Sequence, residues 1–236
     1  DLSRFGFASV QLDGGIEEVG SKVGEWFDEA LTEDGALERV SASAAAITLG
    51  LTATAAGSGA TGVSGPVAEA LARLATGIVA AGGSVVLPEN SSLLAMERFT
   101  RELLADGARA DATLAYGVPA EAPGLHVMEA PTESMLETVT GLGGTGVNVM
   151  LVHLGRSPVP THPMIPVLQV SAEPLVKACY GGDLDLALDP GAPADAVLRA
   201  LADRLCECAG GSYRPHLSAA GMTGFQLTRG LLGISM

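Results

Sequence analysis

The sequence predicts an α/β fold, with a mostly parallel sheet between helices on both faces, in a Rossmann-like three-layer architecture. Apolar runs of strand character alternate with segments of helical periodicity through most of the 236 residues. The run VNVMLVHL, residues 147–154, is apolar at nearly every position, as expected for a strand covered on both faces. The length fits one large α/β domain, so we expect a single domain over residues 1–236.

The alternation predicts each element in turn. Strands are expected at residues 7–12, 45–52, 84–87, 111–116, 125–129, 147–154 and 167–171. Helices are expected at residues 16–31, 67–81, 93–105, 132–142 and 194–208. Parallel strands joined by right-handed crossovers place ligands beyond the carboxyl ends of the strands. The candidate site therefore lies in the loops after Thr52, Leu87, Glu129 and Leu154.

Composition restricts the class of partner. Hydrophobic residues make up 47% of the chain and aromatic residues only 4%, which predicts a core of Ala, Val, Leu and Ile. The formal net charge of −14 repels phosphate backbones, so we expect no nucleic-acid partner. Glycine, serine and threonine interrupt the longest apolar stretch, so we expect no membrane span. The three cysteines form no regular framework, which favours reduced thiols in a cytoplasmic protein.

A loop of small residues, TATAAGSGATGVSG from Thr52, separates an expected strand from an expected helix that begins near Pro66. Its backbone amides and the helix start could hold an anion, and Ser58 could contact it. The loop matches neither of the glycine-rich nucleotide motifs. A plain strand-to-helix turn is the alternative.

Acidic residues follow two of the expected strands. Glu89, followed by Asn90, is a candidate general base or metal ligand, and a carboxylate at a helix start is the alternative. Glu129 ends a strand and Glu133 opens the next helix, a pair that could bind a metal or simply favour the helix start. Asp183 and Asp185 alternate with leucines, which is typical of the solvent face of an edge strand, although the pair could also bind a cation.

The strongest strand ends in His153-Leu154-Gly155-Arg156-Ser157. Arg156 could clamp a carboxylate with two parallel hydrogen bonds. His153 is a candidate acid, base or ligand. His162 lies in a proline-rich loop and could point into the same cleft, although a surface position is the more common one for histidine.

A series of motifs appears in a fixed order along the chain: VQLDGGIEE at 10–18, LGL at 49–51, AAGGSVVLPEN at 80–90, GLHVMEAP at 124–131 and TGLGGTGVNVMLVHLGRS at 140–157. Together these resemble the C-terminal half of the altronate and galactarate dehydratases, a family that also includes a sulfolactate sulfo-lyase subunit. The family removes water from sugar acids, typically with a divalent metal, so the resemblance implies a small carboxylate substrate and such a metal.

The resemblance also implies site residues. It places the substrate carboxylate near Gly155 and Arg156, and it leaves Glu89 and Glu129 as candidates for base or metal ligation, with His153 as a further catalytic candidate. Residues of the matched motifs that become candidates for substrate binding are Asn90, Thr140 and Asn148, beside Ser58 and His162.

The chain departs from the family pattern at its main catalytic loop. The family has Cys-Gly-Gly-Ser-Asp after the LGL strand, whereas residues 53–57 here read ATAAG. The family's N-terminal portions are also missing, so a homo-oligomer or a partner subunit carrying them is expected. Three hypotheses follow. The first is a lyase of the family with a relocated site that uses His153 and His162, and the second is a catalytically inactive ligand-binding or supporting subunit. The third is a hydrolase or another lyase on the same scaffold, with a nucleophile such as Ser58 beside a histidine.

Overall fold

The computed structural model describes residues 43–58, 62–105 and 112–224, together with Ser21 and the segments 228–229 and 234–235. The chain divides into two units, Asp1–Val40 and Ser41–Met236, and the fold described here belongs to the second. The strand expected at 7–12 and most of the helix expected at 16–31 lie outside the described residues.

A seven-stranded sheet, in which every pair of neighbouring strands is parallel, forms the centre of the second unit. Its strands are β1 (Thr48–Ala53), β2 (Ser84–Pro88), β3 (Ala112–Leu114), β4 (Gly124–Met128), β5 (Val149–His153), β6 (Val167–Ser171) and β7 (Leu186–Ala187). They lie side by side in the order β3-β4-β2-β1-β5-β6-β7. The predicted parallel α/β fold is therefore confirmed. Two further segments, β8 (Thr228–Arg229) and β9 (Ile234–Ser235), pair antiparallel with each other.

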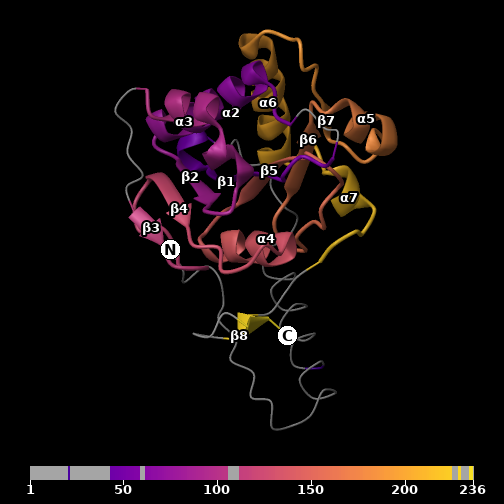
Figure 1. Cartoon of the computed structure of the whole chain (residues 1–236). Helices are drawn as coiled ribbons and strands as arrows, with labels where there is room; N and C mark the ends of the chain where they lie inside the picture. Colours follow the sequence, from indigo (N-terminus) through magenta and orange to yellow (C-terminus); the bar gives the residue numbers. More distant parts are fainter. Residues whose placement is uncertain are drawn as a thin grey trace. The chain divides into compact units, whose positions relative to one another are not determined.

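Helices lie on both sides of this sheet (Figure 1). The helical elements are η3 (Ala44–Ala46), α2 (Gly65–Ala80), η4 (Ser92–Ala95), α3 (Glu97–Leu103), α4 (Met135–Gly144), α5 (Pro174–Tyr180), α6 (Ala194–Ala209) and α7 (His216–Ala219). The labels α2, α3 and α6 lie above the sheet in Figure 1 and α4 lies below it. This arrangement gives the three layers that the sequence predicts.

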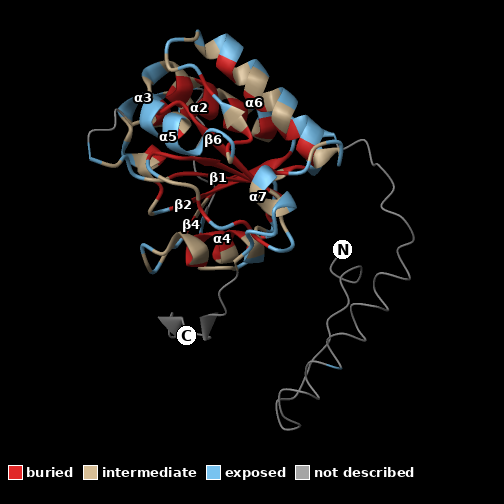
Figure 2. Cartoon of the chain, turned by 90° about the vertical axis from the view of Figure 1, so that its right-hand side faces the viewer, coloured by how far each residue is buried: buried red, intermediate tan, exposed pale blue. Residues whose placement is uncertain are grey.

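The core divides between the two faces of the sheet because successive side chains of a strand point to opposite faces. One cluster joins Leu49 and Leu51 of β1 to α2, α3 and α6, and the other joins Met150 and Val152 of β5 to α4. The strands are buried and the outer faces of the helices are exposed (Figure 2). This burial explains why the central strands read as continuous apolar runs.

The connections make β1 the point where the strand order reverses. From β1 the chain passes to β2 on one side, and it returns later to place β5 on the other side. Ligands in such sheets bind in the crevice outside the carboxyl ends of the two strands at the reversal. The topology therefore favours a site in the crevice between the carboxyl ends of β1 and β5.

Two expected helices differ from the structure, and one helix was not expected. The helix expected at 93–105 is broken into η4 and α3, because Met96 adopts an extended conformation with φ −95° and ψ 111°. Helix α4 begins at Met135 and not at Thr132, since Ser134 caps it by accepting a hydrogen bond from the Glu137 amide. Helix α5, which begins at Pro174, was not predicted because it is short. Strand β7 is an edge strand, as one interpretation of the alternation around Asp183 and Asp185 expected, but it covers only Leu186–Ala187.

The interpretation of Asp185 as an exposed residue of an edge strand is wrong. Asp185 is buried and precedes β7. Its Oδ2 accepts a hydrogen bond from the Gln169 amide at 2.7 Å, and its Oδ1 accepts from the Tyr213 hydroxyl at 2.7 Å and the His216 amide at 2.8 Å. These donors come from β6 and from the segment around α7, so the carboxylate joins two distant parts of the chain.

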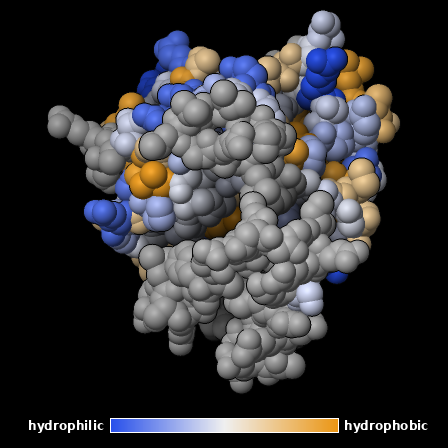
Figure 3. Space-filling view, turned by 90° about the horizontal axis from the view of Figure 1, so that it is seen from below, coloured by the Kyte–Doolittle hydropathy of each residue, from blue (hydrophilic) through white to orange (hydrophobic). Residues whose placement is uncertain are grey.

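Hydrophobic atoms that are visible on the described surface in Figure 3 lie in small separate groups among polar ones. The large hydrophobic side chains that are exposed include Leu104, Val118, Met164, Leu175, Tyr180 and Met222. Among the described residues, none of the helices combines the length and the apolar character that a membrane span requires.

Candidate functional site

A cavity of about 430 Å³ lies at the point where the strand order reverses. Three stretches line it: residues 56–58 after β1, Gly155 and Arg156 after β5, and Leu175 and Val176 at the start of α5. Its volume lies in the range of small-molecule sites. The position agrees with two of the four loops that the sequence predicts for the site.

The loops after β1 and β5 are bound to each other beyond the end of the sheet. The Thr54 amide donates to the His153 carbonyl at 3.0 Å, and the Gly155 amide donates to the Thr54 hydroxyl at 2.8 Å. The Gly57 amide in turn donates to the Gly155 carbonyl at 3.2 Å. One wall of the cavity is therefore a hydrogen-bonded pair of loops.

Gly155 is required by the close approach of these loops. A Cβ atom at this position would lie 2.7 Å from the Thr54 carbonyl oxygen and 2.8 Å from that of Ala55, and both contacts are with backbone. No other residue fits there without displacing the loop after β1. The sequence analysis placed Gly155 among the substrate-binding candidates, and the structure gives it this packing role at the cavity.

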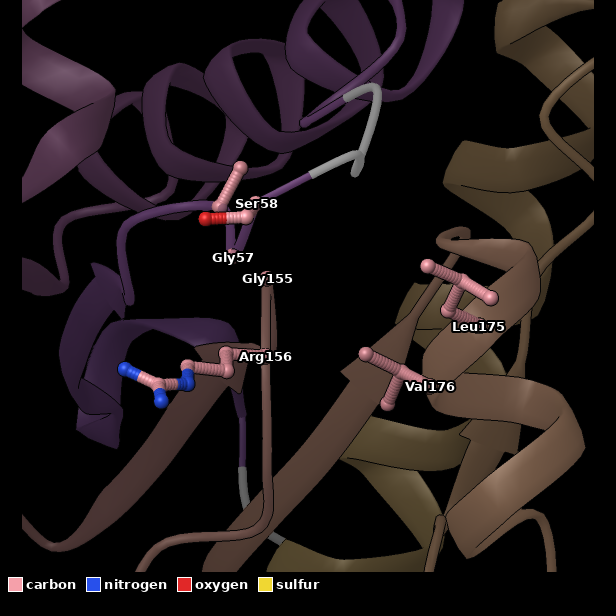
Figure 4. Close-up of a pocket in the computed structure, with 7 residues that line it drawn as sticks. Gly57, Ser58, Gly155, Arg156, Leu175 and Val176 are labelled. Atoms are coloured by element: carbon pink, nitrogen blue, oxygen red, sulfur yellow. The ribbon is translucent and has the colours of Figure 1, made fainter.

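Arg156 carries the positive charge of the cavity wall. Its aliphatic stem passes over Gly57, where an added Cβ would lie 3.3 Å from its Cγ. The guanidinium extends to the side of Gly155 opposite to Leu175 and Val176 (Figure 4). Arg156 is exposed, and among the described residues it has no ion-pair partner within 4.0 Å. A guanidinium in this setting is available to bind a carboxylate.

Ser58 lies in the same wall and is exposed. The hydrolase hypothesis needs a histidine within hydrogen-bond reach of its hydroxyl. His153 does not fill this role, because its Nε2 accepts a hydrogen bond from the Ala172 amide at 3.2 Å and its Nδ1 has no partner among the described residues. Ser58 is therefore a candidate for contact with a ligand, and no histidine hydrogen-bonds to it in the part of the chain that the structure describes.

His153 lies beneath the cavity and does not reach its surface. The side chain is 0% exposed, and burial lowers its pKa to about 4, although the charge of nearby Glu173 partly opposes the shift. The imidazole is thus neutral at neutral pH. By accepting the Ala172 amide, it fixes the turn that leads from β6 into α5.

Glu173 is a buried carboxylate that the sequence analysis missed. It precedes α5 directly, and its Oε2 accepts a hydrogen bond from the Gly62 amide at 3.2 Å, which ties α5 to the loop before α2. The Ser171 hydroxyl accepts from the Glu173 amide at 3.0 Å and donates to the Leu154 carbonyl at 2.7 Å. The sequence Glu-Pro after a strand is the signal that could have identified this helix start.

Glu89 and Glu129 follow β2 and β4, which are neighbours in the sheet. The Glu89 amide donates to the Met128 carbonyl, and the Glu89 Oε1 accepts from the Ala130 amide, both at 2.9 Å. Both glutamates are exposed, and neither lines the cavity. Strand β1 lies between β2 and β5, so Glu89 and Arg156 follow strands that are two strand spacings, about 10 Å, apart at one rim of the sheet.

The side chains at this rim do not fit a divalent metal held by the protein alone. Among the described residues, no three histidine, cysteine, aspartate or glutamate side chains are grouped so that they could hold one. Of the proposed ligands, Glu89 already has one carboxylate oxygen bound to the Ala130 amide. We therefore assign no step to a metal.

Asn90 and Thr140 make contacts that support α4. The Asn90 Nδ2 donates to the Thr132 carbonyl at 2.9 Å and to the Thr138 hydroxyl at 3.1 Å, which joins the end of β2 to the start of α4. The Thr140 hydroxyl donates to the Leu136 carbonyl within the same helix at 2.8 Å. Neither residue lines the cavity.

Asn148 and His162 lie away from the cavity. Asn148 precedes β5, at the amino ends of the strands, where its Oδ1 accepts from the Thr48 amide at 3.1 Å and its Nδ2 donates to the Ala46 carbonyl at 2.9 Å. His162 is buried beside Gly143, near the end of α4 that leads toward β5, and its Nδ1 accepts from the Met164 amide at 3.1 Å. The structure therefore does not bring His162 together with His153.

Comparison with known proteins adds no assignment: no protein-family model matches the chain, and no curated protein matches it either.

Proposed function

We propose that this chain binds a small hydroxy-carboxylate in the cavity between β1 and β5, on a scaffold similar to the C-terminal domain of the sugar-acid dehydratases. The observation that carries the proposal is Arg156, an exposed guanidinium at the cavity with no ion-pair partner among the described residues. Its fork of donors matches both oxygens of a carboxylate.

The negative net charge of the chain supports a binding role for Arg156. A chain with a formal net charge of −14 repels anions at long range, so an anionic ligand needs a local positive group. Arg156 supplies that group, and Ser58 adds a hydroxyl in the same wall. A cavity of about 430 Å³ is large enough for a short hydroxy acid.

We further propose that the chain binds this ligand without removing water from it. A base must come within hydrogen-bond reach of the proton beside the carboxylate. Glu89 and Glu129 do not line the cavity, and His153 is fully buried with Nε2 engaged by the Ala172 amide. The resemblance points the same way, because residues 53–57 replace the family's Cys/Ser/Asp loop. A supporting role beside a catalytic partner subunit fits these features.

Calorimetric titration with hexonates, aldarates, sulfolactate and 2-hydroxyalkanoates tests the binding. We expect at least one of these acids to bind, and we expect Arg156→Met to weaken that binding about tenfold or more, because a charge-assisted contact is lost. Arg101→Met is the matched control, since Arg101 is an exposed arginine on α3 that does not line the cavity. If the two variants bind the acid with equal affinity, Arg156 does not contribute to the binding site.

Dehydration is assayed by the appearance of a ketone, because loss of water from a 2,3-dihydroxy acid yields an enol that becomes a 2-keto-3-deoxy acid. We expect no product above the uncatalysed rate, with or without divalent metals. Product formation that Glu89→Gln or Glu129→Gln abolishes would instead establish the lyase hypothesis.

A further inference from the structure

The buried imidazole of His153 holds the segment that leads into helix α5. His153 ends β5, and its Nε2 accepts a hydrogen bond from the Ala172 amide at 3.2 Å. A neutral imidazole that accepts at Nε2 carries its proton at Nδ1, and this atom has no hydrogen-bond partner in the described part of the chain. The contact between β5 and the segment before α5 therefore requires a neutral His153.

The same segment continues directly into the lining of the cavity. Glu173 follows Ala172 and accepts from the Gly62 amide at 3.2 Å, and α5 then begins at Pro174. Leu175 and Val176, in the first turn of α5, line the cavity. A change at the imidazole of His153 therefore reaches the cavity through a few residues of backbone.

Uptake of a proton would reverse the role of Nε2. A proton from solvent binds the lone pair that now accepts the Ala172 amide, so that two N–H groups would face each other. His153 is 0% exposed, and a charged side chain that is buried without hydrogen-bond acceptors is unfavourable. The imidazolium is therefore compatible only with an arrangement in which water reaches the ring.

The charges around His153 do not remove this conflict. Burial lowers the pKa of His153 to about 4, and the charge of Glu173 opposes the shift only in part. The neighbours of His153 in the sheet, Ala53 on β1 and Val170 on β6, are uncharged. The closed arrangement therefore disfavours the proton, and an open arrangement gains it.

Helix α5 is attached to the domain by fewer buried side chains than β5. Of its seven residues, only Val176 is buried, and β7, the next strand along the chain, is a two-residue edge strand. Strand β5 lies inside the sheet between β1 and β6, and all five of its residues are buried. Segments with few buried contacts open at the lowest free energy. Water therefore reaches His153 at the lowest cost when the start of α5 moves.

We propose that proton uptake by His153 releases the start of α5 from the sheet and opens the α5 side of the cavity, while the central strands stay folded. In the open form Leu175 and Val176 leave the cavity lining, so a ligand that contacts them binds less tightly at acid pH. The proposal concerns regulation of the cavity and does not depend on which ligand binds there.

Amide hydrogen exchange of the full chain, resolved by NMR at pH 6 and pH 5, tests this switch. Each rate, divided by the intrinsic rate at the same pH, gives an opening constant for that amide. We expect the amides of Ala172 and Lys177 to have larger opening constants than that of Met150 in β5. We also expect these constants to rise about five- to tenfold from pH 6 to pH 5, because the open form binds a proton that the closed form excludes.

Two variants assign the effect to a particular histidine. The side-chain carbonyl of His153→Gln can accept from the Ala172 amide but does not titrate, so we expect the opening constants at Ala172 and Lys177 to change less than about twofold over this range. His162→Gln is the matched control, since His162 is a second buried histidine whose pKa burial lowers, and it lies beside Gly143 of α4. This control should keep the rise at α5.

Two results would overturn the switch. If Ala172 and Lys177 have the same opening constant as Met150, His153 gains its proton only when the whole domain unfolds. If His153→Gln keeps the rise at α5, another group causes it. The first comparison uses the wild type alone, so it decides even if the variant does not fold. Neither result bears on carboxylate binding, which the Arg156→Met variant tests separately.

Discussion

Individual residues at the cavity divide into those that face a ligand and those that hold its walls. Arg156 and Ser58 line the cavity, whereas His153 and Glu173 are buried and join the loops around it. The residue type of His153 suggested acid–base chemistry, but its burial and its bond to the Ala172 amide indicate a supporting role. Histidine serves both in acid–base catalysis and as a structural hydrogen-bond partner, so its surroundings decide which role it has.

Buried His153 makes stability depend on pH. Its pKa falls from the ordinary 6.5 to about 4 on folding, so between these values the unfolded chain binds a proton that the folded chain does not. The free energy of unfolding should therefore decrease by roughly 3 kcal/mol, as an upper limit, as the pH falls from 6.5 to 4.

Urea unfolding of the wild type and of His153→Gln across this pH range measures the effect. The glutamine carbonyl can still accept a hydrogen bond from the Ala172 amide, but glutamine does not titrate in this pH range. The free energy of unfolding of the variant should therefore depend less on pH than that of the wild type. Parallel pH profiles of the two proteins would show that burial of His153 does not contribute.

Gly155 gives a second prediction at the residue scale. We expect Gly155→Ala to destabilise the fold by about 2 kcal/mol and to weaken ligand binding, because its Cβ would meet two backbone carbonyl oxygens that cannot move independently. Gly65→Ala is the control, since a Cβ there meets nothing within 4 Å. Chemical unfolding and calorimetric titration report the two effects, and equal behaviour of the variants would contradict the close approach.

At the scale of elements, long apolar runs were predicted well and short segments poorly. Strand β6 and helix α6 were expected within one residue of their observed bounds, because each has a regular pattern bounded by glycine or proline. Helix α5 and strand β7 are too short to show a period, yet α5 provides the apolar wall of the cavity. The candidate site was therefore predicted from its polar side only.

Asp185 connects β6 to the segment before α7, and this contact can be tested. We expect Asp185→Asn to lower the free energy of unfolding by about 3 kcal/mol, because an amide NH₂ would replace one of two oxygens that accept the Gln169 amide, the Tyr213 hydroxyl and the His216 amide. Hydrogen exchange should increase around residues 213–220.

The matched control for this change is Asp183→Asn, which alters a partly exposed aspartate two residues earlier and should change stability by less than about 0.5 kcal/mol. Similar losses in both variants would mean that local charge, and not the buried contact of Asp185, accounts for the effect.

At the scale of the whole molecule, the order of the strands decides which loops meet. The cavity forms because β1 and β5, about 100 residues apart in sequence, are neighbours, as the register of Leu49 with Val149 shows. In the same order, β1 lies between the strand before Glu89 and the strand before Arg156, and both β2 and β1 lie between the strands before Glu129 and Arg156. The three residues were expected to share a site, and in the structure only Arg156 lines the cavity.

The sequence by itself determined the class of fold, because apolar runs and helical periods are local properties that each segment carries. It also identified the loops after the strands, and with them Ser58, Gly155 and Arg156. Only the tertiary structure decided which loops adjoin, that His153 and Glu173 are buried, and that the start of α5 lines the same cavity as Gly155 and Arg156. These are contacts between distant segments, and they depend on strand order and packing, which no local pattern of residues specifies.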